Sequence, residues 1–251
     1  MKKILVLVVA ALMALGLAVP ASALETYTLA VTTDPVDLVT ITGGGPYSEG
    51  TLVPLTAPST ATKAYEFYVF THWDVDEVDV SGNPITVLMD AAHTATANYD
   101  KVLSINKELV YPPSSVVVGT LTPFYMKITL TTFAAVLGVK VTDGIGADLA
   151  WDATHADPDL VASTGTVSER KAGKGKMGAK VVTWTLGDLD AGVSPTLDLF
   201  VQTGLNPKAK QEFTSLGDHS LNDGPTASFT YNGNQYTLKG PAVIVTVVAA
   251  P

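Results

Sequence analysis

The sequence predicts an all-β protein built from two modules. Apolar and polar residues alternate with period 2 along most of the chain, which is typical of half-buried strands. Threonine and valine are abundant, and glycine, proline and asparagine interrupt the pattern at short intervals. No segment has the spacing of a convincing amphipathic helix, so we expect strands throughout.

The first 23 residues are predicted to be a signal peptide. Lys2 and Lys3 precede an apolar run that ends in Ala21-Ser22-Ala23, and these small residues suit a signal peptidase. The alternative is an uncleaved anchor, since the run nearly reaches the roughly 20 apolar residues that cross a bilayer. We expect cleavage, no transmembrane anchor in the mature chain, and a secreted or cell-surface protein.

Charge and composition exclude several classes of function. The formal net charge is −9, and this acidic excess repels nucleic-acid phosphates, so no nucleic-acid partner is expected. The chain has no cysteine, which excludes disulfides, thiolate nucleophiles and zinc–sulfur sites. It also lacks a nucleophile elbow, a P-loop and a dinucleotide-binding fingerprint. We therefore expect no catalytic residues, no cofactor and no enzyme activity.

Residues 24–100 are expected to form the first, small module. Tyr27, Leu29 and Val31 alternate with polar residues, and Ile85 begins a strand directly after Pro84. In that strand Ile85, Val87 and Met89 are expected to point to one side, and Leu52–Val53 to feed another short strand. Phe70 and Trp73 are three residues apart, which places them on opposite faces of a flat strand. A β-bulge between them would bring both rings into one core.

The segment from Tyr65 to Tyr99 resembles the divergent internalin-type B-repeat, a small β-module of secreted surface proteins. The residues that carry this resemblance are Phe70, Trp73, Asp74-Val75-Asp76, Asn83 to Asp90 and His93 to Tyr99. The resemblance implies a β-repeat module over about residues 25–99 in an extracellular protein. It implies no ligand.

Residues 101–251 are expected to form an immunoglobulin-like β-sandwich of seven to nine strands, with one or two long loops. Its expected strands contain Phe124 to Leu130, Val139 to Val141, Val182 to Leu186 and Leu197 to Val201. The apolar run Val243 to Val248 is expected to be a strand of this sandwich that is covered on both faces. The alternative is a donor strand that pairs with another copy.

Residues 102–248 resemble a conserved repeat of unknown function in archaeal and bacterial envelope proteins. The resemblance rests on Val118-Gly119, Val139 to Asp143, Val182 to Leu189 with Ala191-Gly192, and Thr196 to Leu199. Such repeats act as extracellular spacers or assembly modules. The family usually ends in an Asn-x-Ala strand, whereas Asn222 here is followed by Asp223-Gly224-Pro225.

Two charged clusters are candidate binding sites. Asp74, Asp76, Glu77 and Asp79 offer the oxygen ligands that calcium prefers, but EF-hand spacing is absent, and we favour a solvated turn between two strands as their explanation. The basic residues Arg170, Lys171, Lys174, Lys176 and Lys180 alternate with glycines. They could bind an anionic envelope polysaccharide, a protein or another copy of the chain, or they could keep a flexible loop soluble.

Lys107 supports a sharper hypothesis. Several surface sandwich domains join two strands through a lysine–asparagine isopeptide bond that a buried acid assists. Here Lys107 lies in the opening strand of the second module, Asn222 near its end, and Asp143 between them. The alternative is an exposed lysine at a strand end whose ammonium group reaches water.

These features favour a secreted or surface-displayed structural or adhesion-type protein that spaces or presents a binding surface. Two alternatives are an exported hydrolase or carbohydrate-acting protein with an accessory β-module, and a subunit of a surface filament that assembles by strand addition. A hydrolase would need a cleft with convergent acids.

We predict that the secreted protein begins at Leu24, because Ala21 and Ala23 occupy the positions that a signal peptidase reads. N-terminal sequencing of secreted material checks this, and a retained Met1 would contradict it.

Overall fold

The computed structural model describes residues 25–111, 115–146, 149–151, 159–171, 180–203, 215–221 and 224–251. The predicted signal peptide lies outside these residues. Within them every regular element is a strand, which confirms the all-β fold class. In this part of the chain no helix is long and apolar enough to cross a membrane.

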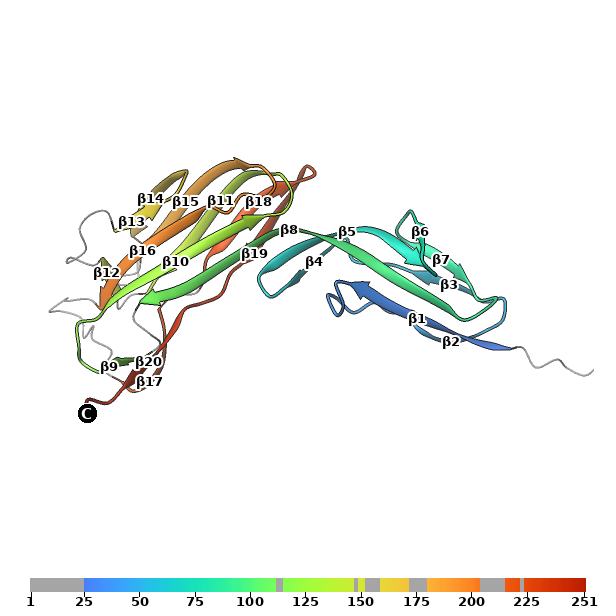
Figure 1. Cartoon of the computed structure of the whole chain (residues 1–251), viewed down its shortest axis with the longest axis horizontal. Coiled ribbons are helices and arrows are strands. Elements are labelled where there is room, and N and C mark those ends of the chain that lie inside the picture. Colours follow the sequence, from blue (N-terminus) through green and yellow to red (C-terminus); the bar gives the residue numbers. More distant parts are fainter. Residues whose placement is uncertain are drawn as a thin grey trace, which may run out of the picture.

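The first module is a set of short strands packed beside one long strand (Figure 1). Its strands are β1 (Thr26–Asp34), β2 (Gly45–Ser48), β3 (Leu52–Leu55), β4 (Thr60–Lys63), β5 (Glu66–Val75), β6 (Val78–Val80), β7 (Ile85–Leu88) and β8 (His93–Tyr111). β8 pairs with β1 on one edge and with β5 on the other, and β3 and β7 form a separate two-stranded sheet. Ile85, Val87 and Met89 are all buried, as their alternation predicts.

A β-bulge brings two aromatic rings of β5 together. The pairing of β5 with β8 shifts register between Phe70 and His72. As a result Trp73 is completely buried, and its ring lies 6.0 Å from that of Phe70, centroid to centroid. The predicted bulge is confirmed, and it lets residues three apart contribute to one core.

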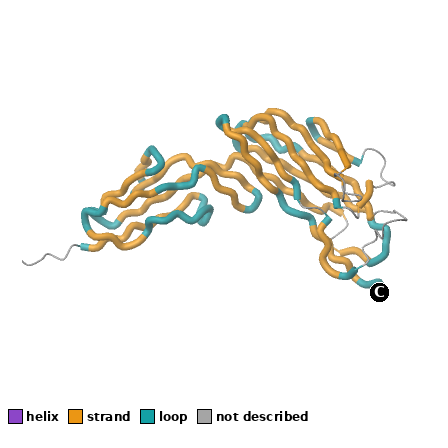
Figure 2. Tube along the Cα trace, turned by 180° about the vertical axis from the view of Figure 1, so that it is seen from behind, coloured by secondary structure: helices purple, strands orange, loops and turns teal. Residues whose placement is uncertain are grey.

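The second module is a sandwich of two sheets, as Figures 1 and 2 show. Its further strands are β9 (Ser115–Val117), β10 (Pro123–Thr132), β11 (Val136–Ile145), β12 (Leu149–Trp151), β13 (Leu160–Ala162), β14 (Thr166–Lys171), β15 (Lys180–Leu189), β16 (Thr196–Thr203), β17 (Gly217–Ser220), β18 (Thr226–Tyr231), β19 (Asn234–Lys239) and β20 (Ile244–Val248). One sheet contains β8, β10 and β16, and the other has the order β14-β15-β11-β18-β19. Strands outnumber the expected seven to nine because the connections carry short strands of their own, such as β9, β13 and β17.

The core of the sandwich follows the predicted alternation. Phe124, Met126 and Ile128 of β10 are buried, and Val141 of β11 and Trp184 of β15 join them in one apolar cluster. The indole Nε1 of Trp184 donates a hydrogen bond of 2.8 Å to the carbonyl of Thr164, so this buried polar atom is satisfied.

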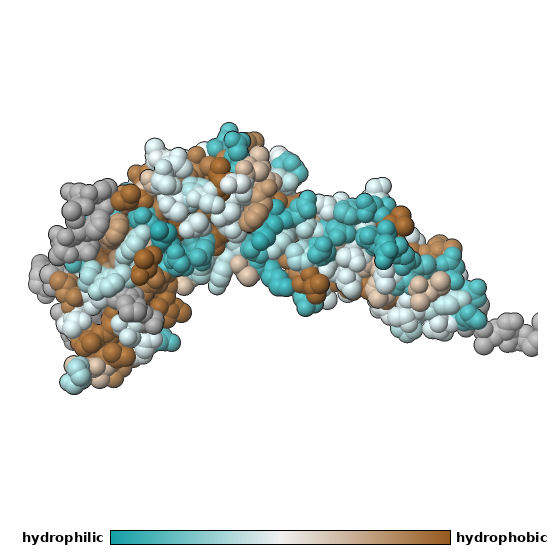
Figure 3. All heavy atoms as spheres, viewed as in Figure 1, coloured by the Kyte–Doolittle hydropathy of each residue, from teal (hydrophilic) through white to brown (hydrophobic). Residues whose placement is uncertain are grey.

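The last strand belongs to its own module. β20 lies between β17, to which it is antiparallel, and β9, to which it is parallel. Val245 and Val247 are buried, but Ile244 is 56% exposed and Val248 39% exposed. The internal strand is therefore confirmed, whereas coverage on both faces is wrong, because this small sheet packs on the core with one face only. Figure 3 shows apolar side chains gathered at this end of the molecule.

We predict that truncation after Lys239 unfolds or aggregates the second module. The deleted segment carries Val243, Val245 and Val247, all buried, and each contributes about 1.5–3 kcal/mol. Together they rival the roughly 5–15 kcal/mol that stabilises a typical domain. Circular dichroism and size-exclusion chromatography measure the outcome. Val245→Ser should destabilise strongly and Ile244→Ser, on the exposed face, weakly; a folded, soluble truncation would contradict the prediction.

Candidate functional site

The acidic cluster of the first module lies at the turn between β5 and β6. Asp76 and Glu77 have φ values of +51° and +65°. Positive φ at both central residues defines the type I′ turn, whose twist matches that of the strands it connects. Aspartate tolerates this conformation better than most residues. The expected turn between two strands is present, with Asp76 and Glu77 at its centre and Asp74 and Asp79 on the adjoining strands.

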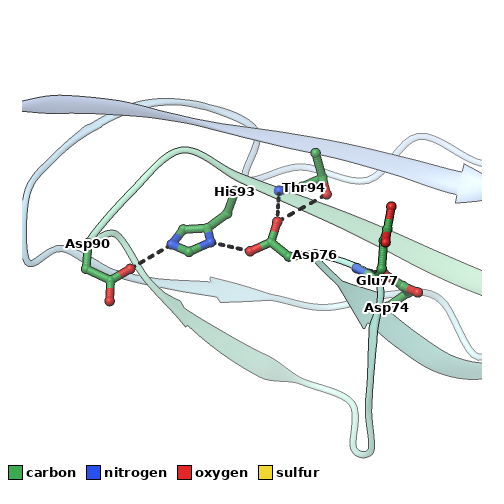
Figure 4. A network of polar contacts seen from close by, with 6 residues as sticks. All are labelled: Asp74, Asp76, Glu77, Asp90, His93 and Thr94. Atoms are coloured by element: carbon green, nitrogen blue, oxygen red, sulfur yellow. Dashed lines mark hydrogen bonds and ion pairs between the residues drawn. The ribbon is translucent and has the colours of Figure 1, made fainter.

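Asp76 connects this turn to the start of β8 (Figure 4). Its Oδ1 accepts a hydrogen bond of 2.8 Å from the backbone N–H of Thr94, and its Oδ2 lies 2.5 Å from His93 Nδ1. The other ring nitrogen, Nε2, lies 2.9 Å from Asp90 Oδ1. One imidazole thus bridges two carboxylates from different turns.

This geometry favours a protonated His93. An ionised carboxylate can only accept hydrogen bonds, so each ring nitrogen must donate one, and only the imidazolium carries both protons. The hydrogen bond with Asp76 is the main cause that raises the pKa of His93, while partial burial opposes the shift and Asp90 reinforces it. The same hydrogen bond lowers the pKa of Asp76.

Three of the four calcium candidates have carboxylates with separate partners. Asp74 Oδ1 accepts a hydrogen bond of 2.8 Å from the backbone N–H of Glu77, and Asp79 Oδ1 lies 3.3 Å from Nε2 of His72. Asp76 is bound to His93 and Thr94. Among the described residues, no group of three or more histidine or acidic side chains is arranged to hold a metal ion. Calcium binding stays a prediction that this arrangement does not support.

A second polar cluster lies where the two modules meet. Lys101 Nζ of β8 lies 2.6 Å from Glu66 Oε1 of β5, and the hydroxyl of Tyr68 donates to the other Glu66 oxygen. The same ammonium group lies 4.7 Å from the ring centroid of Phe133 in the second module. Burial opposes ionisation of Glu66, but the hydrogen bonds from Lys101 and Tyr68 outweigh it and lower its pKa. Burial, followed by Glu66, raises the pKa of Tyr68 to about 12.

Phe67 crosses from the first module into the core of the second. It belongs to β5, yet it is buried in the cluster of the sandwich. Its ring centroid lies 5.2 Å from that of Phe229 in β18 and 4.7 Å from that of Tyr236 in β19. The N–H of Ile105 also donates a hydrogen bond of 3.0 Å to the carbonyl of Tyr65 at the tip of the β4–β5 hairpin. The sequence did not indicate these contacts.

Lys107 is not the exposed lysine that the simpler hypothesis assumed. Its side chain has no exposed area, and it forms an ion pair with the carboxylate of Asp143, which is 1% exposed. Burial lowers the pKa of Lys107, and the neighbouring Asp143 opposes that shift. The structure therefore brings together two of the three residues that the isopeptide hypothesis named. The third, Asn222, lies outside the described residues.

The basic residues of the second module flank one hairpin. Arg170 and Lys171 end β14 and Lys180 begins β15, with Lys171 opposite Lys180 in the pairing. Lys174 and Lys176 lie outside the described residues. Binding by these residues stays a prediction.

Two open hollows on the surface of the described residues can be compared with the cleft that a hydrolase would need. One lies over β18 and β19 and is lined mainly by hydroxyl, amide and aromatic groups, such as Ser228, Gln235 and Tyr236. The other is lined by residues 31–33 and 36–41, among which Asp37 is the one residue with a carboxylate. Neither hollow brings two carboxylates together, as glycoside hydrolysis requires.

Comparison with known proteins finds a family model that matches the first module. Residues 27–103 match the family model of the divergent InlB B-repeat domain. This match confirms the B-repeat resemblance. The resemblance of the second module to the envelope repeat stays a prediction. No curated protein sequence matches the chain.

Several solved structures are similar in outline. The full-length major pilin SpaD from Corynebacterium diphtheriae matches at 12% identity and a TM-score of 0.41, covering 88% of this chain and 65% of the pilin. The major pilin subunit BcpA of Bacillus cereus matches at 12% identity and 0.37, covering 90% and 69%. A cohesin module from a Clostridium perfringens family 33 glycoside hydrolase matches at 9% identity and 0.36, covering 58% and 98%. At these identities and TM-scores the likenesses carry no argument about function.

We predict that the His93 network makes the first module more stable at mildly acidic than at alkaline pH. The contribution of His93 is complete below its unfolded pKa of about 6.5 and disappears as pH rises through its raised folded pKa. That of Asp76 holds above about pH 4 and disappears as pH falls through its lowered folded pKa. Because the side chains of Asp76 and Asp90 are 44% and 68% exposed, solvent screens the pairs and the effect is no more than about 1 kcal/mol.

Urea unfolding of wild type and His93→Gln at pH 5.0 and 8.5 measures this network as a difference in unfolding free energy, which should be larger at the lower pH. His72→Gln, which removes a more exposed histidine of the same module, should keep the wild-type pH dependence. Equal pH dependence in wild type and His93→Gln would show that the network contributes nothing.

Proposed function

We propose that this chain is a non-catalytic structural protein of the cell surface that holds a binding surface at a fixed distance and orientation. In this proposal residues 24–100 and 101–251 are two folding units, each with its own apolar core, and the protein is exported with its signal peptide removed. The match of residues 27–103 to the B-repeat family supports the identity of the first unit.

One observation carries the proposal: a single strand enters both cores. β8 runs for 19 residues, pairing with β1 and β5 in the first module and with β10 in the second. A flexible linker would let two modules rotate independently, whereas a continuous strand with ladders on its edges resists both bending and rotation. Phe67 and the Lys101–Glu66 pair fix the same junction from the side of β5.

A spacer needs a stiff junction between its modules. A catalytic domain that acts independently of its neighbour does not need one. The partner that we propose is a protein or an envelope polysaccharide, which the basic residues Arg170, Lys171, Lys174, Lys176 and Lys180 would attract on an otherwise acidic chain. Self-association into a filament is the second candidate. In the described structure both edges of β20 are paired, so filament assembly would have to use a different strand.

The test compares two phenylalanines of the same strand. Phe67→Ala removes the ring that enters the second core, and Phe70→Ala removes one that packs only within the first module, on Trp73 and Tyr99. We expect Phe67→Ala to loosen the junction, so that small-angle X-ray scattering of the mature protein reports a broader distribution of module orientations than in wild type. It should also destabilise the second module by about 3–5 kcal/mol.

Phe70→Ala should destabilise the first module alone and leave the scattering of the folded protein unchanged. If wild type already behaves as two freely jointed modules, the rigid-spacer function is rejected. Native mass measurement and electron microscopy of the same sample separate a monomeric spacer from a filament subunit. Turnover of glycan substrates would instead support the hydrolase alternative.

A further inference from the structure

The most unusual polar contact in the molecule lies at the centre of the sandwich. Lys107 is on β8 in one sheet and Asp143 is on β11 in the other, so their contact crosses the core from sheet to sheet. Both residues occupy positions whose side chains face the core of the sandwich. Lys107 follows Ile105, and Asp143 lies between Val141 and Ile145, all three of which are buried. The ammonium and carboxyl groups are in direct contact.

Such a pair is costly if it stays ionic. Removing two charges from water carries a penalty that their mutual attraction repays only when the geometry is very good, and an apolar pair of similar volume often serves stability equally well. Burial favours the neutral forms, a free amine and a carboxylic acid. A free amine is a nucleophile, and here the amine nitrogen contacts an oxygen of the Asp143 carboxyl group, with both side chains almost completely buried.

We propose that Lys107 and Asp143 are the reactive centre of an intramolecular amide crosslink, with Lys107 Nζ as the nucleophile. The described residues supply one acceptor, the Asp143 carboxyl group. A C–N bond forms between Nζ and Cγ of Asp143, the C–O bond to the carboxyl hydroxyl breaks, and that hydroxyl leaves as water with a proton from Nζ. No oxidant, metal or cofactor enters this balance. The product is an amide between Lys107 and Asp143, and the protein loses about 18 Da, the mass of one water.

The experiment is intact mass spectrometry of the purified, denatured mature protein, followed by tandem mass spectrometry of its peptides. We expect a mass below that of the sequence by one water, and a branched peptide that joins Lys107 to Asp143. A mass equal to that of the sequence overturns the proposal. Because the readout is taken on denatured protein, it does not depend on any later loss of fold.

A matched pair of variants controls the assignment. Lys107→Arg keeps a cation beside Asp143 but removes the amine, so the mass loss should vanish; Lys127→Arg, on the outer face of β10, should keep it. Dehydration of Asp143-Gly144 to a succinimide also loses water, but it would persist in Lys107→Arg and give no branched peptide. That result overturns the proposal.

The mass that is lost also tests the acceptor. A loss of one ammonia in place of one water would mean that a carboxamide reacts with Lys107, and it overturns the assignment of Asp143 as the acceptor.

Discussion

The structure depends on one strand serving two cores. β8 places Ala95, Ala97 and Tyr99 in the first core and Leu103 and Ile105 in the second. Where the first core ends and the second begins, Val102 is buried as well, and the pairing with β5 shifts register there. Because a slip of one residue would turn both sets of side chains to solvent, the two cores fix the register of this strand together. The orientation of one module is therefore built into the pairing of the other.

Position 101 shows how the strand passes between the cores. Lys101 occupies an inward position where neither apolar cluster covers it completely, and Glu66 supplies the compensating charge. The side chains of Lys101 and Glu66 are 31% and 28% exposed, so solvent largely screens their Coulomb attraction. The direct contribution of the pair to stability is therefore modest. The pair instead helps to fix the position of β5 relative to β8, because it joins the two strands beside Phe67.

Local patterns predicted what depends on local chemistry. The alternation at Ile85, Val87 and Met89 gave the correct buried face, and the three-residue spacing of Phe70 and Trp73 required the bulge that is present. In the same way, the acids at the end of β5 suit a two-residue turn with positive φ. Pairing between distant strands is not encoded in any single segment, so the insertion of Phe67 between Phe229 and Tyr236 could not be read from the sequence.

The burial of Lys107 and Asp143 could have been predicted from the sequence, because the alternation of their strands indicates it more strongly than the surface preference of lysine argues against it. Lys107 lies in phase with Ile105 and Leu109, and Asp143 with Val141 and Ile145, so strict period 2 places both charges inside. Lysine prefers the surface, and that preference argued for an exposed side chain. Each of the two opposite charges lies on the core-facing side of its own strand. They can contact one another only if the two strands face each other across the core. A charged residue that keeps the apolar phase therefore indicates a partner across the core, and here the contact of Lys107 with Asp143 joins the two sheets of a sandwich that has no cysteine.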